Sequence, residues 1–149
     1  MTQTKAKNPV KIMVFGTFDG LHPGHLNFFK QAKDLKPSSR ESFLIVSVAR
    51  DKNVKKIKGR LPLLGEKKRK KLVENSKLAD KVILGSLHDY LAHIKKENPD
   101  VIALGYDQKS PYVDNLRKNL QNYGISPRIL RLRPYMAHIY KNRLLKKKR

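Results

Sequence analysis

Residues 11–36 read KIMVFGTFDGLHPGHLNFFKQAKDLK and predict a strand, a tight loop and a helix in succession. The apolar run 11–18 is typical of a buried β-strand. Gly and Pro concentrate in residues 19–24, which indicates a tight connection. The helix expected over 25–36 carries one apolar stripe, formed by Leu26, Phe29, Ala32 and Leu35. This strand–loop–helix unit is the building block of a parallel α/β sheet.

The rest of the chain repeats the alternation of short apolar runs and amphipathic segments. Further buried strands are expected at 43–49, 81–84, 101–105 and 128–133. Helices are expected at 66–76, 87–97 and 111–123, with a basic helix at the C-terminus. The first of these is expected to face inward through Leu72 and Val73. Residues 50–65 are basic and show no periodicity, so we expect a long loop there.

Strands that are apolar on both faces are typical of a parallel sheet covered by two helix layers. The fold class expected is therefore α/β: a single doubly wound, Rossmann-like parallel sheet of about five strands, with helices on both faces and a C-terminal helix. Residues 1–10 are expected to form a flexible basic tail, and residues 11–149 a single domain. Ligands of such sheets bind at the carboxyl ends of the strands, so residues 19–25 should lie at the site.

The composition excludes several classes of protein. The 149 residues contain no cysteine, which rules out disulfides, cysteine-ligated zinc and a thiol nucleophile. No apolar run reaches the ~18 residues of a membrane span. The N-terminus lacks the apolar segment of a secretory signal peptide. We therefore expect a cytoplasmic location and no membrane partner.

The charge of the chain points to anionic partners. Thirty-four Lys and Arg residues against twelve Asp and Glu residues give a formal net charge of +22. A field of this strength attracts polyanions such as nucleotides, nucleic acids and acidic membrane surfaces. The charge does not distinguish among these partners, so individual residues have to do so.

Two histidines in the first loop, His22 and His25, are candidate catalytic residues. Pro23 stiffens the turn between them, and Gly24 lets the backbone pass closely at the helix start. His25 falls in the first helical turn, where free backbone N–H groups and the helix dipole favour an anion. Two imidazoles beside that anion can donate hydrogen bonds to a phosphoryl group. The alternatives are ordinary polar loop residues, or a zinc site for which no third ligand stands at a suitable spacing.

The ten residues GTFDGLHPGH, 16–25, resemble the G-T-F-D-x-x-H-x-G-H signature of the cytidylyltransferase-like nucleotidyltransferases. Within that superfamily, ARD at 49–51 together with KGR at 58–60 is similar to a segment of the archaeal-type FAD synthases. LGYDQ at 104–108 is similar to the same group, and glycerol-3-phosphate cytidylyltransferases usually carry a different sequence there. The resemblance extends over most of the chain.

This resemblance implies that residues 11–149 form a nucleotidyltransferase domain. A nucleoside triphosphate, ATP or CTP, would bind over the first loop with a divalent metal ion, Mg²⁺, whose protein ligands the resemblance leaves unknown. A phosphate acceptor, which is FMN in the FAD synthases, attacks the α-phosphorus, and pyrophosphate leaves without a covalent enzyme intermediate. The alternative within the family is a cytidylyltransferase of the glycerol-3-phosphate type.

The resemblance also implies roles for individual residues. The catalytic residues would be His22, His25 and Lys58. The nucleotide-binding positions would be Thr17, Phe18, His22, Pro23, Gly24, His25, Gly105, Tyr106, Asp107 and Tyr135. Phosphate would be bound by Arg60 and, where the family usually has Ser and Thr, by Lys141, Asn142 and Arg143. Asp19 would be either a structural or metal-proximal carboxylate or a turn residue bonded to its own backbone.

Other interpretations of these residues stay open. Lys58 and Arg60 also fit a solvated charge run, and Tyr106 and Tyr135 fit half-buried aromatic residues. A hypothesis of a different class is a basic RNA-associated protein on a nucleotidyltransferase fold, which rests on the net charge, on the basic stretch 50–71 and on the C-terminal KKKR. Its affinity for RNA would fall steeply with salt. Members of the superfamily often dimerise, so the resemblance also allows a homodimer.

Overall fold

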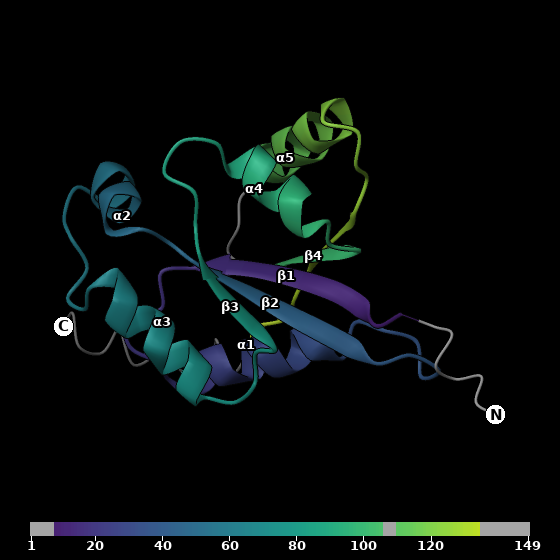
Figure 1. Ribbon diagram of the computed structural model, residues 1–149, viewed down its shortest axis with the longest axis horizontal. Helices are drawn as coiled ribbons and strands as arrows, with labels where there is room; N and C mark the ends of the chain where they lie inside the picture. Colours follow the sequence, from purple (N-terminus) through teal and green to yellow (C-terminus); the bar gives the residue numbers. More distant parts are fainter. Residues whose placement is uncertain (1–7, 106–109, 135–149) are drawn as a thin grey trace, which may run out of the picture.

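A computed structural model describes residues 8–105 and 110–134, and its order of elements is that of an α/β sheet (Figure 1). Five strands form one sheet, and all neighbouring pairs are parallel. The strand order is β3-β2-β1-β4-β5. The strands are β1 Val10–Gly16, β2 Ser42–Val48, β3 Lys81–Leu84, β4 Val101–Leu104 and β5 Arg128–Arg131.

Two layers of helices cover the two faces of the sheet, as expected for a doubly wound fold (Figure 1). The helices are α1 Pro23–Lys33, α2 Asp51–Lys58, α3 Glu66–Asn75, α4 Tyr90–Glu97 and α5 Ser110–Asn122. One core cluster joins Phe29 of α1 and Val73 of α3 to one face. A second cluster joins Ile94 of α4 and Leu116 of α5 to the other face. The two clusters confirm the predicted fold class.

The predicted elements lie within a few residues of the observed ones, with one exception. Residues 50–65 do not form a long loop throughout, because α2 occupies the first half of this stretch. The helix buries only Val54 and ends at Gly59, which has the left-handed φ of 83°. Its apolar residues are only Val54 and Ile57 among lysines, too few for periodicity to indicate a helix. The predicted C-terminal helix lies outside the described residues.

The strand order places a topological switch point beside β1. The chain passes from β1 through α1 to β2 on one side, and β4 pairs with β1 on the other side. Ligands of open α/β sheets bind at such a point, at the carboxyl ends of the strands. Residues 17–25 and Gly105 follow β1 and β4 directly, so they flank this position.

Two observations concern the ends of the domain and membranes. Val10, which the sequence placed in the tail, pairs with Ser42 as the first residue of β1 and is buried. Within residues 8–105 and 110–134, no helix is long and apolar enough to cross a membrane.

Candidate active site

The two histidines of the first loop cap the N-terminus of α1. His22 is the N-cap residue, and its Nδ1 accepts a hydrogen bond from the Gly24 N–H at 3.0 Å. His25 lies three residues further on, and its Nδ1 accepts one from the His22 N–H at 3.3 Å. The rings stack with centroids 3.8 Å apart and an interplanar angle of 25°. The pair thus forms a capping box built from imidazoles in place of the usual hydroxyl and carboxyl groups.

These hydrogen bonds fix which ring atom carries the proton. A neutral imidazole whose Nδ1 accepts a hydrogen bond has its proton on Nε2. Partial burial lowers the pKa of His25 to about 4, with a smaller contribution from the neighbouring His22. His25 is therefore neutral at neutral pH and presents Nε2–H as a hydrogen-bond donor rather than as a cation.

The expectation of free backbone N–H groups at His25 is wrong. The N–H of His25 donates to the carbonyl oxygen of His22 at 2.9 Å, and that of Leu26 donates to the same oxygen at 3.2 Å. The Gly24 N–H is taken up by the His22 ring. The first turn of α1 contains no acidic residue, so the helix dipole still favours an anion there.

Two glycines make room for this arrangement. A Cβ atom on Gly24 would lie 2.7 Å from Cε1 of His22, so the ring folds over this residue only because it has no side chain. A Cβ atom on Gly16 would lie 2.5 Å from Cζ of Phe18. Phe18 itself has a left-handed φ of 52° and turns its ring into the core, edge-on to His25 with centroids 5.5 Å apart. The Phe18 ring therefore packs against His25 from the side of the core.

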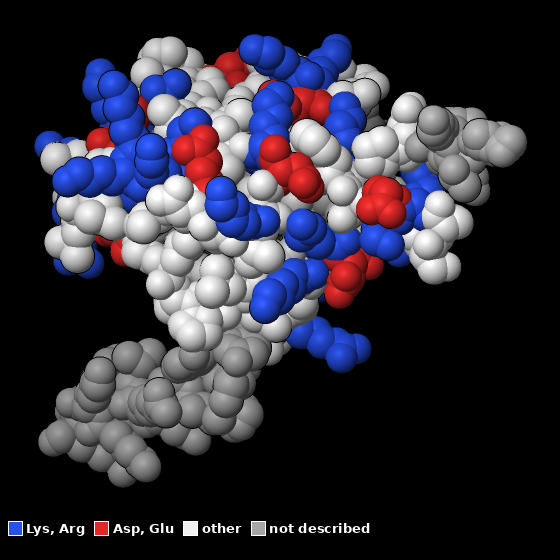
Figure 2. All heavy atoms as spheres, turned by 60° about the horizontal axis from the view of Figure 1, so that its bottom comes forward, with Lys and Arg blue, Asp and Glu red and all other residues white. Residues whose placement is uncertain are grey.

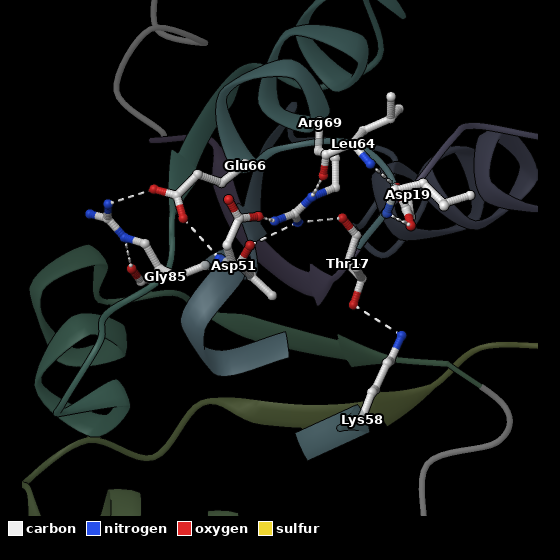
Figure 3. Close-up of polar contacts among 11 residues, drawn as sticks. Thr17, Asp19, Asp51, Lys58, Leu64, Glu66, Arg69 and Gly85 are labelled. Carbon is white, nitrogen blue, oxygen red and sulfur yellow. Dashed lines mark hydrogen bonds and ion pairs between the residues drawn. The ribbon is translucent and has the colours of Figure 1, made fainter. Parts of the chain in front are cut away.

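A second segment, residues 58–64, is fastened to the first loop (Figure 3). Lys58 Nζ donates to Thr17 Oγ1 at 3.3 Å. The two carboxylate oxygens of Asp19 accept the N–H groups of Leu63 and Leu64 at 2.7 and 2.8 Å. These two bonds, that of Leu64 first, hold the pKa of Asp19 below its ordinary value. Asp19 is thus a structural carboxylate whose partners lie far along the chain, not in its own turn.

Arg69 joins four segments around the first loop, and the sequence analysis missed it. Its side chain is fully buried. The guanidinium donates to the carbonyl oxygens of Thr17, Ala49 and Leu64 and to the Asp51 carboxylate, with distances of 2.6 to 2.9 Å (Figure 3). The signal was a charged residue one turn before Val73, on the face of α3 predicted to be apolar. A charge at such a position is buried only with partners.

The carboxylate of Glu66 extends the hydrogen-bond network around Arg69, which we call the joint. One of its oxygens accepts the Asp51 N–H at 2.8 Å, and the other accepts Arg50 Nη1 at 3.1 Å. Arg50 Nε in turn donates to the Gly85 carbonyl oxygen after β3, at 2.8 Å. The ARD sequence at 49–51 therefore connects the carboxyl ends of β2 and β3 to the N-terminal turns of α2 and α3.

The described residues do not build a metal-binding cage. Among residues 8–105 and 110–134, no group of three or more His, Asp or Glu side chains is placed to hold a metal ion. Near the first loop, the oxygens of Asp19 accept backbone N–H groups and the Asp51 carboxylate pairs with Arg69.

The remaining predicted site residues are only partly described. Gly105 follows β4 at the switch point, and Arg60 is exposed just after α2. Gln31 of α1 exchanges two hydrogen bonds with the backbone of Arg133, at 2.9 and 3.0 Å, which ties the chain after β5 to α1. Outside the described residues lie Tyr106, Asp107, Tyr135, Lys141, Asn142 and Arg143.

On the face shown in Figure 2, the charged side chains are not gathered into one area. Lys and Arg side chains alternate there with Asp and Glu side chains and with uncharged ones. Around α2 and α3 the lysines are mostly exposed, whereas Asp51 and Glu66 are paired with Arg69 and Arg50. The exposed lysines of this region therefore face solvent without these two carboxylates as partners.

Comparison with known proteins shows similarity along nearly the whole chain. Residues 13–143 match a family described as cytidylyltransferase-like. An FAD synthase from Ferroglobus placidus is 44% identical over 126 residues, which span 83% of this chain and 76% of that protein.

Solved structures share the fold. A lipopolysaccharide core biosynthesis protein from Thermoplasma volcanium is similar with a TM-score of 0.76 and 34% identity, over 86% of this chain and 99% of that one. A protein of unknown function from Archaeoglobus fulgidus has a TM-score of 0.63 at 13% identity, over 83% of this chain and 90% of that one, and this likeness concerns the fold alone.

Proposed function

Because the chain belongs to the cytidylyltransferase-like family, we propose that it is an FAD synthase, a nucleotidyltransferase that transfers the adenylyl group of ATP to FMN. The observation that carries this proposal is the stacked histidine pair at the N-terminus of α1, in a chain that is 44% identical to an FAD synthase. Pyrophosphate is the second product.

The reaction is a substitution at the α-phosphorus of ATP. A phosphate oxygen of FMN forms the new bond to that phosphorus, and the bond from phosphorus to the bridging oxygen of pyrophosphate breaks. His22 and His25 hold Nε2–H groups that donate hydrogen bonds to the α-phosphoryl oxygens as negative charge builds on them. The enzyme contributes positioning and charge stabilisation and forms no covalent bond to substrate.

The other predicted residues take supporting roles in this proposal. Lys58, held beside Thr17, neutralises the triphosphate. Phe18, Pro23 and Gly24 shape the loop beneath it. Gly105 with Tyr106, Asp107 and Tyr135 receives the nucleoside, and further phosphate contacts come from Arg60, Lys141, Asn142 and Arg143. Support for these assignments comes from the switch-point position and from the sequence resemblance.

A divalent metal ion is typical of such enzymes, and we propose Mg²⁺ carried by the triphosphate. The carboxylates around the first loop are already engaged by N–H groups and by Arg69. Mg²⁺ is commonly bound through substrate phosphates and water, which suits a site of this kind. The chemistry it supplies is neutralisation of the phosphate charge.

The test is direct. The protein is incubated with ATP, FMN and Mg²⁺, and FAD and pyrophosphate are measured. CTP replaces ATP in a second reaction, because the family includes enzymes of both preferences. Product formed only from CTP and glycerol 3-phosphate would assign the chain to the alternative cytidylyltransferase activity.

The remaining expectations from the sequence are secondary to this proposal. A cytoplasmic location fits an enzyme without cysteine that consumes ATP. Nucleic-acid binding and homodimer formation are separate hypotheses that rest on the sequence alone. RNA titrations at several salt concentrations and sedimentation analysis would test these two hypotheses.

A further inference from the structure

We propose that Ile57, Leu61 and Leu63 form the surface on which the isoalloxazine ring of FMN rests. The inference builds on the proposed function and concerns the part of the site that selects the acceptor. These three side chains are 82%, 57% and 94% exposed. Three large apolar side chains left in water within seven residues call for a covering partner. We name them the apolar patch.

The position of the apolar patch relative to the first loop comes from five hydrogen bonds. At one end, Lys58, the neighbour of Ile57, reaches Thr17. At the other end, the N–H groups of Leu63 and Leu64 are held by the Asp19 carboxylate.

Arg69 also connects the two segments, because its guanidinium donates to the carbonyl oxygens of both Leu64 and Thr17 (Figure 3). Asp19 stands three residues before His22, so the Leu63 end of the segment is bound to the same loop that carries the histidine pair. The proposal places the ring of the acceptor on the patch and its phosphate toward that pair.

The chemistry of the segment matches FMN better than a small polar acceptor. FMN carries a flat, largely apolar ring system at one end and a phosphate dianion at the other. Residues 55–63 carry both kinds of group, because the apolar patch is interleaved with exposed cations. These cations are Lys55, Lys56, Lys58 and Arg60. Glycerol 3-phosphate has no apolar surface that would gain from these contacts.

Leu63 also lines a hollow in the protein surface. Leu63 lines an open hollow of about 490 Å³ between the first turns of α2 and α3, together with Lys52, Gly65, Lys67 and Lys68. The two acidic residues in its lining, Asp51 and Glu66, are paired with Arg69 and Arg50. The hollow therefore combines an apolar wall with uncompensated positive charge, which suits an anion with an aromatic ring.

The test is the double substitution Ile57→Ser with Leu63→Ser. Both side chains are exposed, so the core is unaffected and the variant folds. We expect the KM for FMN, and the Kd for FMN from quenching of flavin fluorescence, to rise about tenfold or more, because the ring loses two apolar contacts. The KM for ATP stays at the wild-type value. Leu63→Phe keeps the apolar contact and retains FMN affinity.

Leu87→Ser is the matched control, because Leu87 is also exposed but lies outside the patch, before α4. It should leave both KM values unchanged. An unchanged FMN KM in the double variant, with wild-type FAD synthesis intact, overturns this inference and leaves the proposed function standing. Absence of FAD from the wild-type protein overturns both. A dimer that dissociates in the double variant, with FMN binding unaltered, would assign the patch to contact between copies of the chain.

Discussion

The imidazole rings of His22 and His25 stack 3.8 Å apart while each Nδ1 accepts a backbone N–H group. One edge of each ring therefore stabilises the helix, and the other carries the proton that we propose is donated to substrate. A histidine substitution usually changes stability and activity at the same time. Here the two contributions reside on different ring atoms, so a suitable replacement separates them.

Replacing either histidine by asparagine should slow catalysis strongly and preserve the fold. The asparagine Oδ1 stands close to the place of Nδ1 and can accept the same backbone N–H, but it has no donor at the position of Nε2. We expect His22→Asn and His25→Asn each to lower kcat about 10²-fold or more, with the melting temperature near wild type. Alanine at these positions should lower kcat similarly and cost about 1 kcal/mol of stability in addition. Near-wild-type turnover in both asparagine variants would remove the proposed chemistry.

Gly24→Ala should damage activity through His22 alone. The new Cβ would meet the His22 ring at 2.7 Å, so the ring has to turn away and loses its hydrogen bond from the N–H of residue 24. Loss of this cap should lower the free energy of unfolding in urea by about 1 kcal/mol. The kcat should fall about tenfold or more, because misplacement of a catalytic group by about 1 Å is costly. Gly20→Ala is an unsuitable control, since the φ of Gly20 is 105° and would itself strain the loop.

The stability of the protein should decrease in mild acid because of His25. Its pKa is about 4 in the folded state and near 6.5 in the unfolded chain. Below pH 6.5 the unfolded state takes up a proton that the folded state refuses, so the free energy of unfolding falls as the pH drops toward 4 and then levels off. Urea denaturation at pH 7.5, 6.5, 5.5 and 4.5 measures this change. His25→Asn should weaken the pH dependence in this interval; identical slopes for the two proteins would contradict the burial of a neutral ring.

Arg69→Met should destabilise the fold and the site together. The substitution leaves three carbonyl oxygens and the Asp51 carboxylate without their donor. We expect a loss of about 3 kcal/mol or more in the free energy of unfolding, typical of a broken buried ion pair. Lys68→Met, on the exposed side of the same helix, is the control and should change stability by less than about 0.5 kcal/mol. A change for Arg69→Met as small as that of the control would contradict its role as the joint.

Lys58→Ala should weaken binding of the triphosphate. Its ammonium group stands beside Thr17, where the triphosphate is proposed to lie. We expect the KM for ATP to rise about tenfold while the KM for FMN changes little, as measured by steady-state kinetics with each substrate varied in turn. Lys56→Ala, an exposed lysine of the same helical turn, is the matched control. An effect on FMN alone would contradict the assignment of Lys58.

The features that the sequence predicted correctly are local ones. Apolar runs such as 43–49 indicated buried strands, and the spacing of His22 and His25 indicated their place at a helix start. The hydrogen bonds of Arg69 were not predictable in this way, because most of its partners are backbone carbonyls, and those of Ala49 and Thr17 lie 20 and 52 residues away. The role of Asp19 was missed in detail for the same reason, since its partners lie 44 and 45 residues away.

The protonation of His25 was also beyond a local pattern. The sequence left open whether both imidazoles act as cations, and burial decides this for His25. Burial depends on the ring of Phe18, which packs edge-on to His25 from a left-handed backbone position. A sequence motif records which residues are present, whereas the polarity around them is set by the folded chain.

The guanidinium of Arg69 holds together segments that would not keep their arrangement on their own. Its partners at Thr17, Ala49, Asp51 and Leu64 come from stretches that a protein engineer would regard as separate parts. Transplanting the first loop alone onto another scaffold would leave Thr17, at its start, without the hydrogen bond that Arg69 donates. A functional graft has to bring α3 along, with the residue that faces inward from it.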